Sequence, residues 1–203
     1  MAKTVNHSEA RSQILRAALK HFAHSGYAAA SVQRIVDEAR VSKPALYYHF
    51  QDKAGLFQAL VDQAHDERNR LMQAAAASTA DLKSQLVEVL TALFDYMQNN
   101  RELMRIAFAS AFAAPGEVPE GLRCSVKCER NFEFIHSLMK KGVTAGVLDR
   151  QFDSRELAFG FYGQLNSYQA SQLLMPDCRL NRQTAVRIVK LFLAGAAAKK
   201  RTV

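Results

Sequence analysis

The chain has 203 residues, 49% of them hydrophobic, enough for one large domain or for a small domain joined to a larger one. Lysine and arginine number 27 against 19 aspartate and glutamate; this net charge of +8 favours a polyanionic partner, nucleic acid or an anionic membrane surface. The first residues lack the apolar segment of a signal peptide, and no apolar run approaches the roughly 20 residues of a bilayer span. The three cysteines form no disulfide framework. We therefore expect a cytoplasmic protein with no membrane partner.

Apolar residues recur with helical periodicity along the whole chain. Sustained alternation of β-branched and polar residues is missing, as are Asn-Gly and Asp-Gly hairpin turns. Only four prolines and nine glycines interrupt the pattern, which suits long helices joined by short turns. The sequence therefore predicts an all-α protein.

The first three predicted helices are short. The first covers about residues 8–25 and ends at Gly26, a residue suited to a left-handed helix terminus. Ser31 is a good N-cap for the second helix and Ser42 for the third. Three such helices bury too little surface to stand alone, so we expect them to pack on a fourth helix, capped by Asp52.

The later helices are longer. We expect them over approximately residues 53–77, 81–99, 101–113, 122–145, 154–174 and 181–198. Pro176 ends the helix that begins near residue 154. The chain is thus expected to consist of a small N-terminal helical domain and a larger helical bundle.

Residues 31–50 have the proportions of a helix-turn-helix motif, in which about nine residues, a tight turn and a second helix follow one another. In the second helix Leu46 and Phe50 face inward. The opposite side presents hydroxyl, imidazole, cationic and apolar groups, the kinds that contact phosphates and base edges in a major groove. These residues are Lys43, Pro44, Tyr47, Tyr48 and His49.

Lys53 lies in the first turn of the next helix, where the helix dipole disfavours a cation. A phosphate bound against that helix end explains the position. The first 59 residues carry eight Lys and Arg against four Asp and Glu, half of the total excess. The alternative is that the N-terminal helices simply present a solvated basic face.

The segment GYAAASVQRIVDEARVSKPALYYHFQDKAGLF, residues 26–57, resembles the DNA-binding segment of TetR-family transcriptional regulators. The matching positions are spaced along the segment: Gly26, Tyr27, Ser31, Ile35, Val41, Ser42, Leu46 to Phe50, Lys53 and Leu56. The resemblance covers about the first quarter of the chain, and the rest is similar in architecture only. It implies a three-helix DNA-binding domain with a helix-turn-helix, residues 1–53, and a helical domain for ligand binding and dimerisation, residues 54–203.

The resemblance also implies roles for single residues. The DNA backbone is bound by Ser31, Tyr47 and Lys53. The bases are faced by Gln33, Lys43, Pro44 and Tyr48, with Ala45 and His49 beside them. Together with the turn residues, the expected DNA-binding set is Ser31, Gln33, Arg40, Ser42, Lys43, Pro44, Ala45, Tyr47, Tyr48, His49 and Lys53.

Two positions depart from the family pattern. Arg40 stands where the family commonly has a glycine in the turn; a left-handed non-glycine residue costs about 1 kcal/mol, so the turn is either strained or differently shaped. The added positive charge near DNA offsets that cost. Ala45 stands where a hydroxylated residue is frequent, and its methyl group can touch a thymine methyl but cannot hydrogen-bond.

Small residues line one face of the helix near residues 154–174, and a similar stripe follows on the last helix. Such stripes let another helix approach closely, either within one subunit or across a subunit boundary. The resemblance favours the second interpretation, a four-helix dimer interface with two helices from each chain. The residues expected there are Gly160, Gly163, Ser167, Ala170, Ile188 and Phe192.

Aromatic residues and methionines concentrate between residues 94 and 175. Each of these side chains alone is ordinary for a hydrophobic core, but together they are more than the core of a small helical bundle needs. TetR-like proteins often enclose a ligand in this part of the chain. The expected ligand-binding residues are Met104, Phe108, Phe112, Cys128, Phe132, Met139 and Tyr162, with polar handles at Tyr162, Gln164, Asn166 and His136.

Signals of catalysis are weak. Cys124 and Cys128 lie on an apolar stripe as small buried residues, and His21 and His24 have no further ligands at metal-site spacing. Phosphate loops, dinucleotide fingerprints and nucleophile elbows are absent from the sequence, so we expect no catalytic residues, metal or cofactor.

These patterns favour a homodimeric, sequence-specific regulator that binds double-stranded DNA at a palindromic operator. The simplest form is a repressor that is released by a small apolar or amphipathic ligand. Two alternatives stay open: a TetR-like protein that is constitutive or controlled by a protein partner, and an enzyme with an accessory DNA-binding domain.

Overall fold

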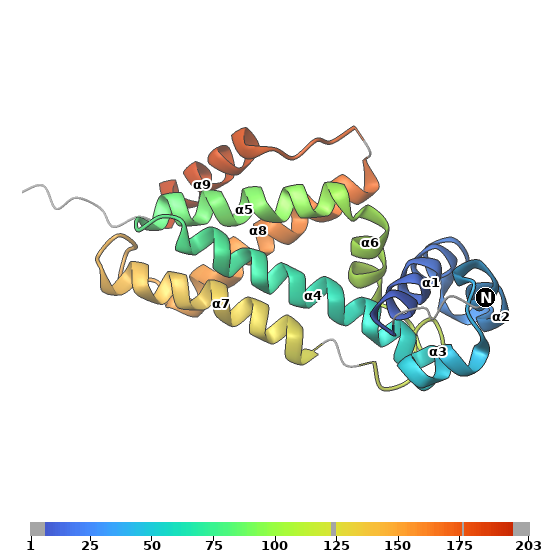
Figure 1. The fold of residues 1–203 in the computed structure, drawn as a ribbon. Helices are drawn as coiled ribbons and strands as arrows, with labels where there is room; N and C mark the ends of the chain where they lie inside the picture. The colour runs from blue at the N-terminus through green and yellow to red at the C-terminus, as the bar shows by residue number, and fades with distance from the viewer. Residues whose placement is uncertain (1–6, 123–124, 176, 197–203) are drawn as a thin grey trace, which may run out of the picture. The chain divides into compact units, whose positions relative to one another are not determined.

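The computed structural model describes residues 7–122, 125–175 and 177–196, so Cys124 and Pro176 lie outside the described residues. The described residues form helices and no strand (Figure 1). None of these helices is long and apolar enough to cross a membrane. The helices are α1 (His7–Ala29), α2 (Val32–Ala39), α3 (Lys43–Phe50), α4 (Lys53–Ala77), α5 (Leu82–Asn99), α6 (Arg101–Ser110), α7 (Ser125–Thr144), α8 (Ser154–Leu174) and α9 (Arg182–Ala196).

Polar side chains cap several of the predicted helix starts, although Ser31, the N-cap predicted for α2, makes no side-chain capping hydrogen bond. The Asp81 carboxylate accepts a hydrogen bond from the Ser84 N–H at 2.9 Å, and the Asp153 carboxylate accepts one from the Arg155 N–H at 2.8 Å. These carboxylates satisfy first-turn amides that have no partner inside the helix. The all-α prediction is confirmed, while α6 ends at Ser110, three residues earlier than expected.

The chain divides into two compact units, Met1–His65 with Arg101–Ser125, and Asp66–Asn100 with Val126–Val203. The helix α6 therefore groups with the N-terminal helices, although the sequence placed it in the larger domain. The reason is that α6 packs on α1: Leu103 and Met104 are buried, and the Arg105 guanidinium donates a hydrogen bond to the Ala23 carbonyl at 2.6 Å. The helix α4 contributes residues to both units.

The core of the first unit holds the helix-turn-helix in place. Ile14, Ile35 and Leu46 are fully buried, one each from α1, α2 and α3. Aromatic rings extend this core, with the Phe22 and Phe57 centroids 5.1 Å apart in an edge-to-face arrangement. The inward face that the sequence predicts for α3 is thereby confirmed.

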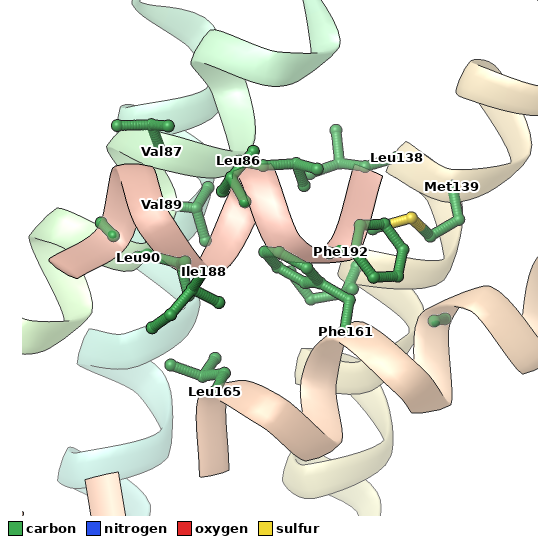
Figure 2. Packing of buried hydrophobic residues seen from close by; sticks show 14 of the residues in the cluster. Leu86, Val87, Val89, Leu90, Leu138, Met139, Phe161, Leu165, Ile188 and Phe192 are labelled. Atoms are coloured by element: carbon green, nitrogen blue, oxygen red, sulfur yellow. The ribbon is translucent and has the colours of Figure 1, made fainter. Parts of the chain in front are cut away.

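The core of the second unit joins α5, α7, α8 and α9 (Figure 2). Phe161 and Phe192 meet edge to face with centroids 5.2 Å apart, and Ile188 is 1% exposed. The assignment of Ile188 and Phe192 to a dimer interface is therefore wrong, because both side chains are enclosed by their own subunit. They point into the cluster beside Leu165 and Leu86.

Candidate nucleic-acid interface

The sequence allowed either a strained or a differently shaped turn between α2 and α3, and the structure has the strained form. Arg40 has φ 56° and ψ 42°, in the left-handed region, and its N–H donates to the Asp37 carbonyl at 3.2 Å. The next N–H, of Val41, donates to the Val36 carbonyl at 3.0 Å. These bonds end α2 and leave the Arg40 side chain exposed beside the start of α3.

The helix α3 is anchored on one side and exposed on the other. Leu46 and Phe50 are 0% and 5% exposed, whereas Tyr48 is 74% exposed and Tyr47 is 45% exposed. The Ser42 hydroxyl accepts a hydrogen bond from the Ala45 N–H at 3.3 Å, so Ser42 caps the helix as predicted. The apolar anchor fixes the direction in which the exposed hydroxyls point.

The expected DNA-binding residues divide by exposure. The side chains exposed to solvent are Gln33, Arg40, Ser42, Lys43, Pro44, Tyr47 and Tyr48, and the partly buried ones are Ser31, Ala45, His49 and Lys53. The Gln33 amide donates to the Asp37 carboxylate at 2.7 Å, one turn along α2. The structure thus gathers Lys43, Tyr47 and Tyr48 on one exposed face of one helix.

Lys53 has a structural role that the sequence did not predict. Its ammonium donates hydrogen bonds to the carbonyls of Tyr27, Ala28 and Ala30 at 2.9, 3.1 and 3.2 Å. It also lies 4.6 Å from the centroid of the Tyr27 ring. Since an ammonium has three donors, these carbonyls account for the cation at the start of α4 without a phosphate.

Tyr27, which lies under this ammonium, is held in its neutral form. Burial raises the pKa of Tyr27, and the negative charge of Asp52 raises it further. The phenol ring therefore stays an uncharged surface for Lys53. The segment between Gly26 and α2 is in this way tied to the beginning of α4.

The connection from α3 to α4 is a second strained turn. Gln51 has φ 62° and ψ −51°, and the Asp52 N–H donates to the Phe50 carbonyl at 2.7 Å. This is a γ-turn of the rare type near φ +75° and ψ about −65°. A Cβ atom at Gly55 would lie 2.1 Å from the Phe50 carbonyl oxygen, so only glycine allows α4 to start this close to α3.

We predict that Gln51→Gly raises the free energy of unfolding by about 1 kcal/mol. Relief of a strained conformation is worth roughly 1–3 kcal/mol, and the entropy of glycine in the unfolded chain offsets part of it. Urea unfolding of the full chain measures the change. Arg40→Gly, in the ordinary left-handed region, is the matched comparison and should give a smaller gain. A lower stability for Gln51→Gly contradicts the strained geometry.

His7 joins the exposed face of α3, although the sequence analysis did not select it. Its ring centroid lies 5.6 Å from that of Tyr48 and 6.0 Å from that of His49. The contact depends on where the start of α1 lies relative to α3 within the first unit. Sequence spacing carries no signal of this proximity.

The expected ligand-binding residues are divided between the two units. Met104, Phe108 and Phe112 lie in the first unit, and the other four lie in the second. The Phe112 side chain is 91% exposed, so its assignment to an enclosed pocket is corrected: the helix ends before it. Phe132 is 8% exposed, with its ring 4.5 Å from that of Phe159.

The small-residue stripe of α8 is open within its own subunit. Among the residues that the structure describes, a Cβ atom at Gly163 would meet no atom within 4 Å, and one at Gly160 would meet only the Phe192 ring, at 3.9 Å. Beside them Phe159 is 60% exposed, and on α9 Leu191 is 63% exposed. Close packing within one subunit therefore does not account for Gly163.

Comparisons with known proteins agree with this architecture. Residues 14–60 match the family described as bacterial regulatory proteins, tetR family. The transcriptional activator FasR of Mycolicibacterium smegmatis is 33% identical over 110 residues, which are 54% of this chain and 50% of FasR. For this relative, the match thus spans only about half the length of each protein.

A longer match and a structural neighbour complete the comparison. The probable regulator ArpR of Pseudomonas putida is 39% identical over 176 residues, 83% of this chain and 82% of ArpR. The structure of the regulator FadR from Bacillus subtilis in complex with stearoyl-CoA has a TM-score of 0.77 at 18% identity, covering 91% of this chain and 98% of that one. Together with the helix-turn-helix geometry, the match to ArpR over most of both chains shows that this protein belongs to the tetR family of bacterial regulatory proteins.

Proposed function

We propose that this protein is a transcriptional regulator that binds a palindromic operator as a homodimer. The observation that carries the proposal is the exposed face of α3, where Lys43, Tyr47 and Tyr48 are held outward by the buried Leu46 and Phe50. A cation and two hydroxyls on one rigid helix match the donors that read phosphates and base edges in a major groove.

A dimer holds two copies of α3 at a fixed distance from each other, which sets the spacing of their contacts on the DNA. The open face of α8 around Gly163, with exposed apolar side chains beside it, fits a second helix pair from an identical chain. A two-fold dimer presents two copies of α3 to two inverted half-sites. The operator of such a protein is therefore a palindrome.

Control by a small molecule is the remaining part of the proposal. The regulator FadR, whose fold this chain shares, was crystallised with stearoyl-CoA. We infer that a ligand bound in the helical second unit lowers operator affinity, and that the protein acts as a repressor. A ligand has this effect only if it binds the DNA-incompetent conformation more tightly than the competent one.

The DNA contact is tested by replacing Lys43. Lys43→Ala should weaken binding to the best site by about 1–3 kcal/mol and reduce the slope of log K against log salt by about one unit. Fluorescence anisotropy with labelled DNA between about 50 and about 200 mM salt measures both quantities.

Lys83→Ala is the matched control, because Lys83 is an exposed lysine on α5 of the second unit. It should leave the affinity and the slope unchanged. Equal effects of the two substitutions would show that the chain binds DNA through general charge and not through α3.

A further inference from the structure

A pocket of about 250 Å³ lies between α1 and the end of α2, within the first unit. Two of the residues that line it, Ala17 and Ala39, are 4% and 6% exposed, and their short side chains leave the space between the helices unfilled. The charged residues that line it are Arg16, Lys20, Glu38 and Arg40. The pocket therefore combines a small apolar base with charged walls.

Two arginines in these walls have free guanidinium groups. Arg16 lies on α1 and Arg40 is the residue that ends α2, and both side chains are exposed. Neither guanidinium makes a hydrogen bond or an ion pair with the part of the chain that the structure describes. A guanidinium presents a planar fork of donors that matches two oxygens of a phosphate or a carboxylate. The donors of both arginines are thus available to an anion in the pocket.

The carboxylate in the wall, that of Glu38, has its own partners. It accepts a hydrogen bond from the Lys20 ammonium at 2.7 Å, and its other oxygen lies 2.9 Å from the His21 Nε2 atom. The hydrogen bond from Lys20 lowers the pKa of Glu38, so the carboxylate is ionised near pH 7. The lining thus holds three cations and one anion, a net charge of +2, and Glu38 leaves both arginines unpaired.

The backbone at Arg40 is a second, independent indication of a function. Its φ of 56° lies in the left-handed region, which glycine adopts without strain and a residue with a Cβ atom does not. Strained residues of this kind cluster at functional sites. The same turn leads into Ser42, the N-cap of α3. The pocket therefore adjoins the start of the helix that we propose to read DNA.

We propose that the pocket between Arg16 and Arg40 binds a phosphate group. Guanidiniums from two different elements can hold the oxygens of one phosphate from two sides, and a pocket of this size is too small for a large cofactor. Two sources supply this chemistry: a backbone phosphate of the DNA beside the half-site, and a free phosphorylated small molecule. The first source rests on the proposed regulatory function, and the second does not.

Calorimetric titration of the DNA-free protein with inorganic pyrophosphate tests the site. Sodium chloride keeps the ionic strength constant, so that general screening is equal at every point. The parent protein should bind pyrophosphate, and Arg16→Gln and Arg40→Gln should each weaken this binding about tenfold, because each removes a charged donor. In NMR spectra of the parent, the amide signals of Ala17 and Ala39 should shift during the titration, which locates the anion in the pocket.

Glu38→Gln gives a result that damage to the fold cannot imitate. The substitution removes the negative charge from the wall and frees the Lys20 ammonium, so pyrophosphate should bind about threefold or more tightly. Arg150→Gln is the matched control, because Arg150 is an exposed arginine in the turn before α8, in the second unit. It should leave the affinity unchanged. Far-UV circular dichroism checks the fold of each variant.

DNA titrations distinguish the two sources of the phosphate. If it belongs to DNA, Arg16→Gln should weaken binding to a duplex that extends beyond the inverted repeat and reduce the salt slope by about one unit, and Glu38→Gln should strengthen that binding. If it belongs to a free molecule, both variants should bind this duplex as the parent does, and only the pyrophosphate titration should respond.

Specific outcomes overturn the phosphate site. They are no pyrophosphate binding by the parent protein, equal affinities of Arg16→Gln and Arg150→Gln, or binding by folded Glu38→Gln that is no tighter than that of the parent. The regulator proposal fails separately: a parent that binds pyrophosphate through Arg16 and Arg40 but selects no DNA sequence keeps this site. A chain that selects a DNA sequence but binds no pyrophosphate keeps its regulatory function and loses the site.

Discussion

Gly163→Leu is expected to give a monomeric protein that is no less stable than the parent subunit. A side chain at this position has open space within the subunit, and leucine in place of glycine inside a helix contributes about 1 kcal/mol. The same side chain in a close helix contact between two subunits would overpack it, at a cost of about 1–3 kcal/mol. Sedimentation velocity should show monomer at concentrations where the parent is dimeric.

Loss of the dimer should have a large effect on DNA binding. Two linked half-site contacts bind about 100- to 10,000-fold more tightly than one contact does, so Gly163→Leu should lose most of its operator affinity. Each α3 helix remains intact, and the variant should still bind single half-sites weakly. Anisotropy with one palindrome and one isolated half-site measures the difference.

Gly142→Ala is the control for the dimer experiment. A Cβ atom there would lie 2.5 Å from a Leu82 methyl carbon and 2.9 Å from a Leu148 methyl carbon, so this variant should unfold more easily yet stay dimeric. If Gly163→Leu stays dimeric with full operator affinity, the interface lies elsewhere on the chain.

Lys53→Met is expected to lower the free energy of unfolding by about 2–3 kcal/mol. The substitution removes charge-assisted hydrogen bonds to Tyr27, Ala28 and Ala30, each worth about 1.5–3 kcal/mol when well buried and less where solvent reaches it. Urea unfolding followed by circular dichroism measures the loss.

Lys43→Met is the counterpart, because Lys43 is exposed on α3. It should leave stability unchanged and reduce the salt slope of DNA binding by about one unit, whereas Lys53→Met should change that slope by less. The opposite pattern, a stable Lys53→Met with a slope reduced by a full unit, would assign Lys53 to a phosphate.

The sequence predicted the helices and the orientation of α3 because both depend on local patterns. Ser42 and Asp153 cap their helices with side-chain hydrogen bonds within two or three residues along the chain. Leu46 and Phe50 are four residues apart, so they share one helix face in any helical structure. The exposure of Tyr48 follows from that geometry.

Features that depend on residues far apart in the sequence were missed. The carbonyls bound by Lys53 are more than 20 residues away, and the buried Arg68 guanidinium donates a hydrogen bond to Gln169, which is 101 residues away. Charged residues on helices usually face solvent, so no pattern marked Arg68 as buried. Periodicity alone also cannot distinguish a stripe covered by α5 from one left open for a partner, which is why Ile188 was assigned to the wrong surface.

Selection from random double-stranded DNA by the purified 203-residue chain tests the central claim most directly. The account predicts enrichment of an inverted repeat, because two copies of α3 related by two-fold symmetry read identical half-sites. Tyr48→Ala should relax the preference at a few base pairs of each half-site without changing their spacing. Recovery of no enriched sequence, or of a single asymmetric half-site, would contradict it.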